Sequence, residues 1–231
     1  MPLHQLHLVT EPRREPSELV RVVGLALDGG IDWVQLRNKS ASAAAMYADG
    51  RQLYKITAEH QAYLAINDRL DVALALVADG VHLAGQSLPV EAAVSLAAGR
   101  VLVGRSVHSL NEARAAETAG ADYLTFGHVF PTTSHPGLPP RGLKELREIV
   151  YAVEVPVLAI GGITADNLDS VLETGCAGIA VISAILADPE PDRAARRLRT
   201  ALDASTHQPR HPFPSPARRE KDAAHRQPTA V

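Results

Sequence analysis

The sequence is poor in cysteine and in aromatic residues. It has one cysteine in 231 residues, which excludes an intramolecular disulfide and a zinc site built from several cysteines. Only 4% of the residues are aromatic, whereas alanine, valine, leucine and isoleucine are abundant. This composition is typical of proteins whose parallel strands are buried on both faces beneath helices. Cys176, which stands in a run of small residues, is therefore expected to be a buried apolar side chain rather than a nucleophile.

Long hydrophobic runs are also missing. No stretch is long enough to span a membrane, and the first ten residues lack the charged and then apolar pattern of a signal peptide. We therefore expect a cytoplasmic protein. The ten histidines form no cluster with the spacing of metal ligands, so no metal site is expected from them.

Positive charge is concentrated at the C-terminus. The net charge is −3, but residues 204–231 alone carry a net +3, so residues 1–203 carry −6. An acidic body argues against nucleic-acid binding. The segment 204–231 has five prolines and almost no large apolar residue, which predicts disorder. The predicted organisation is one domain over 1–203 followed by a disordered Pro/Arg-rich tail over 204–231.

Short apolar segments alternate with amphipathic ones along the body. The predicted strands span 6–10, 32–37, 62–67, 80–84, 101–106, 122–127, 155–160 and 177–182. Among the helix starts, Ser109 with Glu112 forms a capping box, and Thr164 is expected to open a helix. Eight strand and helix units in about 200 residues predict a (β/α)₈ TIM barrel. An open doubly wound sheet is the alternative, although no GxGxxG motif follows the first strand.

Polar residues gather where the predicted strands end, which is where such barrels place their active sites. His128 follows the strand at 122–126 with the parity of Leu124 and Phe126, so we expect it at the rim as a general acid/base. The other predicted substrate-binding residues lie at strand ends or in the loop after His128: Gln35, Arg37, Lys39, Asn67, Asp68, Ser106, Thr132, Ser134 and Arg141.

A phosphate site is predicted after the last two strands. Gly161 and Gly162 follow the seventh strand, and Ile182, Ser183 and Ala184 follow the eighth. Glycines and a serine at helix starts supply backbone N–H groups and positive helix ends, which is how these barrels hold phosphate. Either segment alone is also compatible with a simple turn, but both together favour phosphate binding.

Seven motifs carry a family resemblance: QLRNK at 35–39, INDR at 66–69, GVHL at 80–83, GRSVHS at 104–109, GADYLTFGHVF at 120–130, PVLAIGGIT at 156–164 and GIAVISAI at 178–185. In this order the set resembles the thiamine phosphate synthase/TenI superfamily. The resemblance implies one of two activities. The synthase joins a pyrimidine diphosphate to a thiazole phosphate using magnesium, whereas the TenI branch is a thiazole tautomerase that works without metal.

Three local features favour the tautomerase. Ser87 stands where the synthase pattern has an acidic magnesium ligand, and a hydroxyl is a poorer ligand than a carboxylate. The synthase loop that usually reads GPIFPT here carries His128, and Ser134 and His135 stand where Thr-Lys is expected. The motifs GRSVHS and GLPPRG also resemble the tautomerase branch. We therefore expect an isomerase without a cofactor that aromatises a carboxythiazole phosphate precursor, with His128 relaying the proton and Arg37 and Lys39 binding anions.

Two alternatives stay open. One is thiamine phosphate synthase itself, which would require magnesium. The other is a non-catalytic phosphate-binding regulator, which would keep the glycines and Arg37 but would not need His128. In each case the expected partner is a small phosphorylated thiazole, with no nucleic acid and no membrane, and a homodimer is possible.

Overall fold

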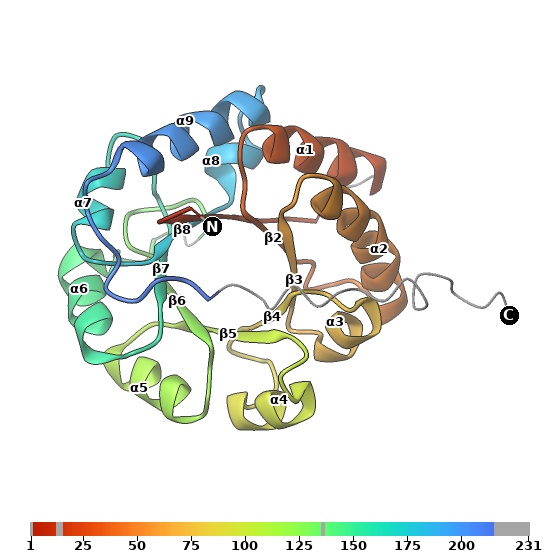
Figure 1. Ribbon diagram of the computed structural model, residues 1–231, viewed down its shortest axis with the longest axis horizontal. Helices are drawn as coiled ribbons and strands as arrows, with labels where there is room; N and C mark the ends of the chain where they lie inside the picture. The colour runs from red at the N-terminus through yellow and green to blue at the C-terminus, as the bar shows by residue number, and fades with distance from the viewer. Residues whose placement is uncertain (1, 13–15, 135–136, 215–231) are drawn as a thin grey trace, which may run out of the picture.

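A closed barrel of parallel strands organises the chain. The computed structural model describes residues 2–12, 16–134 and 137–214 (Figure 1). Its eight strands follow one another around the barrel in chain order, and the first strand pairs with the last to close it. Every pair is parallel, with helices between consecutive strands, so the predicted (β/α)₈ TIM barrel is confirmed.

The strands are short and agree with the predicted segments to within two residues at each end. Their bounds are β1 (Gln5–Val9), β2 (Trp33–Leu36), β3 (Tyr63–Asn67), β4 (Gly80–Leu83), β5 (Leu102–Val107), β6 (Tyr123–Gly127), β7 (Val157–Ile160) and β8 (Gly178–Val181). Most of their residues are buried, because the barrel interior covers one face and the helices cover the other.

The helices form the outer ring in Figure 1. Their bounds are α1 (Pro16–Asp28), α2 (Ala43–Glu59), α3 (Leu70–Leu76), α4 (Val90–Ala97), α5 (Leu110–Thr118), α6 (Gly142–Ala152), α7 (Leu168–Leu172), α8 (Ser183–Leu186) and α9 (Pro191–Ala204). Helix α9, which was not predicted, starts with a proline in its first turn and packs against α1. Arg199 of α9 forms an ion pair of 2.9 Å with Asp32, just before β2.

Helix α7 begins later than expected. Thr164 was predicted to open it, but the helix starts at Leu168. The backbone N–H of Thr164 donates to Oδ1 of Asn167 over 2.9 Å, and Nδ2 of Asn167 donates to the carbonyl of Gly162 over 2.9 Å. These two bonds hold residues 162–167 in a turn ahead of the helix. The cap at Ser109 is confirmed, because its hydroxyl accepts from the N–H of Glu112.

Alternate residues of β6 face two different cores. Leu124 and Phe126 pack with the helix residues of the outer core. Tyr123 instead packs inside the barrel with Trp33 and other inward residues. The parity that places Leu124 and Phe126 on one face therefore points toward the helices, not toward the barrel mouth.

The segment after α9 packs against the barrel, so the predicted tail boundary at 204 differs from the structure. Phe213 is buried, and its ring centroid lies 4.9 Å from those of His7 and Tyr123 and 5.7 Å from that of Trp33. In Figure 1 this blue segment runs across the barrel. One large aromatic side chain is enough to dock it, because the barrel end offers a matching set of rings. The rest of the predicted tail, 215–231, lies outside the described residues.

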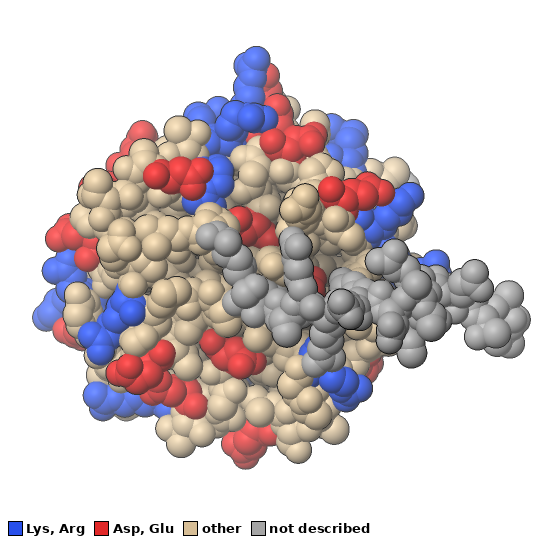
Figure 2. All heavy atoms as spheres, in the orientation of Figure 1, with Lys and Arg blue, Asp and Glu red and all other residues tan. Residues whose placement is uncertain are grey.

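The surface carries charges of both signs, interspersed on the face shown in Figure 2. Within residues 2–12, 16–134 and 137–214, no helix is both long enough and apolar enough to cross a membrane.

Candidate active site

Two amides begin a polar network at the carboxyl ends of β2 and β3. Gln35 and Asn67 are 7% and 3% exposed and share the inward parity of Trp33 and Ala65 on their strands. Nε2 of Gln35 donates to Oδ1 of Asn67 over 2.7 Å, and Nδ2 of Asn67 donates to Oδ2 of Asp68 over 2.5 Å. The sequence therefore predicted a group of residues that the structure brings into contact. The two amides fix the orientation of the Asp68 carboxylate.

Asp68 joins the ends of β3 and β4. Its backbone φ of 62° turns the chain sharply after Asn67. Oδ1 accepts from the N–H of Ala84 over 3.0 Å and from the hydroxyl of Ser87. The same N–H of Ala84 also reaches Oγ of Ser87 at 2.7 Å. A carboxylate and a hydroxyl, both half-buried, are thus held side by side at the barrel mouth.

A second polar group lies inside the barrel and is centred on His82 of β4. Nε2 of His82 lies 2.8 Å from Oγ of Ser106, and Nδ1 lies 3.2 Å from the hydroxyl of Tyr123. Burial lowers the pKa of His82 to about 4, against the raising effect of the Asp68 charge, so its imidazole is neutral near pH 7. The sequence could have indicated this contact, because the alternation of side chains along β4 and β5 turns both His82 and Ser106 toward the barrel interior.

His128 lies in the loop just after β6, because the strand ends at Gly127. It is 8% exposed, and its Nε2 lies 3.3 Å from the carbonyl of Leu138. A Cβ built on Gly161 would lie 2.3 Å from Cβ of His128, so the β7 loop approaches this close only because residue 161 is glycine. His128 is therefore a packed loop residue whose ring meets a backbone carbonyl.

Arg141 supports the same loop. Its Nε donates to the carbonyl of Gly127 over 3.2 Å, and its backbone N–H donates to the carbonyl of His128 over 3.0 Å. Nδ1 of His108 also lies 2.8 Å from the carbonyl of Gly127. Farther along, Oγ1 of Thr132 accepts from the N–H of Ser134 over 3.3 Å. His135 lies outside the described residues.

The predicted phosphate residues follow the last two strands. Gly161 and Gly162 have φ values of 102° and 67°, which only glycine adopts readily. A Cβ on Gly162 would lie 2.5 Å from the carbonyl oxygen of Pro131, so both glycines also serve the packing of two loops. Ser183 begins α8, directly after Ile182, and Ala184 continues it. Phosphate binding by this set stays a prediction.

The two predicted cations stand at the end of β2. The backbone N–H of Arg37 donates to Oγ1 of Thr10 over 2.9 Å, which ties the loop after β2 to the end of β1. Arg37 is half-buried and Lys39 is exposed. Their roles as anion partners stay predictions.

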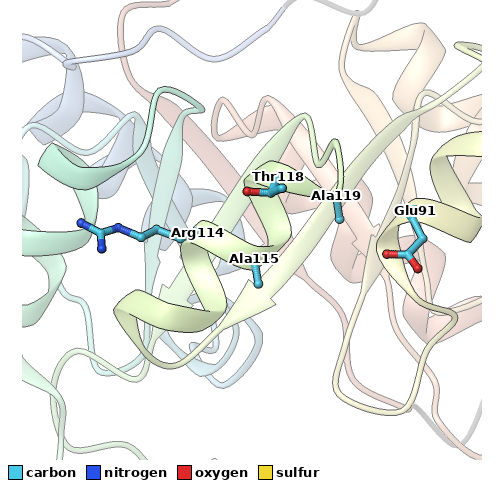
Figure 3. A pocket seen from close by; sticks show the side chains of 5 residues that line it. All are labelled: Glu91, Arg114, Ala115, Thr118 and Ala119. Carbon is cyan, nitrogen blue, oxygen red and sulfur yellow. The ribbon is translucent and has the colours of Figure 1, made fainter.

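A hollow on the outside of the barrel is separate from these residues. It lies at helices α4 and α5 and is lined by Glu91, Arg114, Ala115, Thr118 and Ala119 (Figure 3). None of the predicted site residues lines it, and Glu91 and Arg114 lie at opposite ends of it in this view. The polar network at the strand ends, rather than this hollow, is the candidate active site.

Comparison with known proteins separates the two activities that the motifs left in competition. Residues 6–185 match the protein family described as thiamine monophosphate synthase. Thiamine-phosphate synthase of Pyrococcus horikoshii is 43% identical over 199 residues, covering 86% of this chain and 95% of that protein. The Natronomonas pharaonis protein of the same name is 44% identical, covering 79% of this chain and 86% of that protein.

A solved structure agrees in fold and in sequence. Thiamine phosphate pyrophosphorylase from Pyrococcus furiosus superposes with a TM-score of 0.79 at 43% identity, covering 86% of this chain and 95% of that one.

The prediction of a thiazole tautomerase, and hence of an isomerase, is wrong, because the two curated relatives, of which this chain covers 95% and 86%, are named thiamine-phosphate synthase. Two of the residues used for that prediction make contacts in the structure that the sequence did not predict. Ser87 stands beside a carboxylate, because its hydroxyl donates to Oδ1 of Asp68. His128 meets a backbone carbonyl in its own loop. The chain belongs to the thiamine monophosphate synthase family.

Proposed function

We propose that the protein is a thiamine-phosphate synthase, a transferase that joins a pyrimidine diphosphate to a thiazole phosphate. The observation that carries this proposal is the 43% identity to a named synthase over 95% of that synthase's length. The network of Gln35, Asn67, Asp68 and Ser87 supports it, because it gathers oxygen ligands at the catalytic end of the barrel.

The residues around Asp68 fit a magnesium ion. Mg²⁺ is usually bound by one or two carboxylates together with water and substrate phosphates. Here Asp68 supplies a carboxylate, and Ser87 supplies a hydroxyl in contact with it. A serine hydroxyl and an aspartate also hold Mg²⁺ in P-loop enzymes. Asp68 and Ser87 would hold the ion, which would neutralise charge on the diphosphate as it leaves.

The reaction explains why a general base is not required. The ring nitrogen of the thiazole uses its lone pair to form a bond to the methylene carbon of the pyrimidine. The bond from that carbon to the diphosphate oxygen breaks, and the diphosphate leaves with the electron pair. The attacking nitrogen carries no hydrogen, so no proton has to be removed from it. His128 therefore has no proton to relay in this step.

The remaining site residues would bind and orient the two substrates. Arg37 and Lys39 place positive charge at the end of β2, where they would pair with phosphate oxygens. The backbone N–H groups around Gly161, Gly162 and Ser183 would hold the phosphate of the thiazole. Positioning of this kind accounts for much of the catalysis in a reaction between two bound substrates.

The test is product formation by the purified protein. Given the pyrimidine diphosphate, the thiazole phosphate and Mg²⁺, the protein should form thiamine phosphate and inorganic diphosphate in equal amounts. Asp68→Asn should lower the rate by about 10²-fold or more, because it removes the carboxylate charge at the metal position. The matched control is Asp71→Asn, whose carboxylate is exposed and paired with Arg69. No product from the parent protein would refute the proposal.

A further inference from the structure

Three inward-facing residues form a hydrogen-bonded row that runs from deep in the barrel toward its mouth. Tyr123 of β6 is 1% exposed, and His82 of β4 is 2% exposed. The tyrosine hydroxyl lies 3.2 Å from Nδ1 of His82, and Nε2 of His82 lies 2.8 Å from Oγ of Ser106 on β5. Only Ser106, at the upper end of the row, is partly exposed.

Gly104 makes this row possible. In the sheet, Gly104 is the register partner of both His82 and Tyr123, so β5 lies between them. A Cβ on Gly104 would lie 2.1 Å from Cζ of Tyr123. Because residue 104 has no side chain, the phenol ring extends across β5 and brings its hydroxyl to the imidazole. Their ring centroids are 5.6 Å apart.

The direction of the two hydrogen bonds depends on the tautomer of His82. If Nδ1 carried the hydrogen, it would donate to the tyrosine oxygen, and the hydroxyl hydrogen of Tyr123 would need another acceptor. Within the described part of the chain, that hydroxyl makes its hydrogen bond to His82 alone. A buried hydroxyl without an acceptor is costly. With the hydrogen on Nε2, both buried groups are satisfied.

We propose that Tyr123 fixes His82 in the Nε2–H tautomer and thereby makes Ser106 a hydrogen-bond donor toward an anionic oxygen of the substrate. Tyr123 donates to Nδ1, and Nε2–H donates to Oγ of Ser106. The serine oxygen is then occupied as an acceptor from below, so its own hydrogen is free to point into the barrel mouth. Tyr123 and His82 are positioning residues that act through Ser106.

The substrate part of this inference rests on the proposed function, since a diphosphate presents several oxygens that accept hydrogen bonds and none that must donate. A serine fixed as a donor suits such a ligand. Were His82 to accept from Ser106 instead, the serine would present only lone pairs to the anion, which would disfavour binding.

The first test reads the tautomer directly. The full-length protein, labelled with ¹⁵N at histidine, is studied by long-range ¹H–¹⁵N correlation spectroscopy near pH 7, and His82→Gln assigns the signal. The inference predicts a protonated Nε2 and an unprotonated Nδ1. In Tyr123→Phe the donor to Nδ1 is gone, so the preference for this tautomer should weaken. A parent protein with the hydrogen on Nδ1 would overturn the inference.

The second test measures affinity for inorganic diphosphate with Mg²⁺ by calorimetry, which requires no turnover. Ser106→Ala should weaken binding by about tenfold or more, Ser106→Thr should retain most of it, and Tyr123→Phe should weaken it several-fold. Tyr63→Phe is the matched control, because it removes a hydroxyl from the same aromatic cluster. Equal affinity in Tyr123→Phe and the parent would refute the positioning role. If both tests succeed and no thiamine phosphate forms, the proposed function alone fails.

Discussion

The hydroxyl of Ser87 donates to Oδ1 of Asp68, although the two residues are 19 positions apart in the chain. The contact places a neutral ligand where the synthase pattern has a second carboxylate. A magnesium ion here would be held by one protein charge instead of two, so the diphosphate must supply much of the remaining negative charge.

Replacing Ser87 by aspartate should therefore tighten magnesium binding. In Ser87→Asp the concentration of Mg²⁺ that gives half the maximal rate should fall by about tenfold, because a second carboxylate adds charge to the site. The measurement is the rate of thiamine phosphate formation against free Mg²⁺, together with a calorimetric Mg²⁺ titration. Ser87→Ala is the control and should shift the curve the other way. An unchanged half-saturation in Ser87→Asp would show that residue 87 does not contact the metal.

His128 should have little influence on turnover. His128→Gln keeps an amide N–H near the position of Nε2 that can reach the carbonyl of Leu138, and the proposed bond formation needs no base there. The value of kcat should stay within about fivefold of the parent, well below the 10²-fold or larger loss expected for a general base. Steady-state kinetics with both substrates is the measurement. A loss of two orders of magnitude with unchanged KM values would restore a proton-transfer role for His128.

Phe213 should stabilise the barrel without affecting catalysis. Its ring is 7% exposed and packs on His7, Trp33 and Tyr123, so Phe213→Ala should lower the free energy of unfolding by about 3 kcal/mol. Phe213→Leu should cost less, because it keeps most of the buried volume. Urea unfolding gives both values. If Phe213→Ala unfolds at the same urea concentration as the parent, the segment does not dock on the barrel in solution.

His7 should make the protein less stable in acid. Burial lowers the pKa of His7 well below its usual value. The unfolded chain binds a proton near pH 6.5 that the folded chain does not bind. The free energy of unfolding therefore decreases as the pH falls below about 6.5, by at most about 1.4 kcal/mol per pH unit for this residue.

His7→Phe should flatten that dependence, which urea unfolding at several pH values between 7 and 5 would measure. His60→Gln is a control of opposite sign, because the carbonyl of Ile56 and the carboxylate of Asp28 raise the pKa of His60. Its stabilising effect is present below pH 6.5 and is lost as the pH rises, so removing it should steepen the acid loss. A parallel pH profile in His7→Phe and the parent would contradict a buried, neutral His7.

Hydrophobic patterning was sufficient to predict the fold. Each of the eight strands is an apolar run bounded by polar residues. In the structure the eight strands pair in chain order and form a closed barrel. The helix at Pro191–Ala204 was missed although its buried residues, such as Ala194, Leu198 and Leu202, recur at helical spacing. The packing of Phe213 was not predicted, because the average composition of a proline-rich segment indicates disorder even where one aromatic residue packs on the barrel.

The contacts within the candidate site were predicted in part. Gln35, Asn67 and Asp68 were predicted to lie together because parallel strands bring their carboxyl ends together, and the structure places the three in contact. The contact between Asp68 and Ser87 depends on how the loop after β4 folds back, which no periodicity encodes. Without that contact, Ser87 was interpreted as the loss of a metal site, and this interpretation was one of the three features that favoured the tautomerase.

The most direct test of the account follows both possible products in one reaction. The purified protein is given the thiazole phosphate, its non-aromatic precursor, the pyrimidine diphosphate and Mg²⁺, and phosphorus NMR records the products over time. The account predicts equal amounts of thiamine phosphate and inorganic diphosphate, with both abolished by excess chelator and restored by added Mg²⁺. An unreacted diphosphate, together with isomerisation of a non-aromatic thiazole phosphate that persists in chelator, would contradict it.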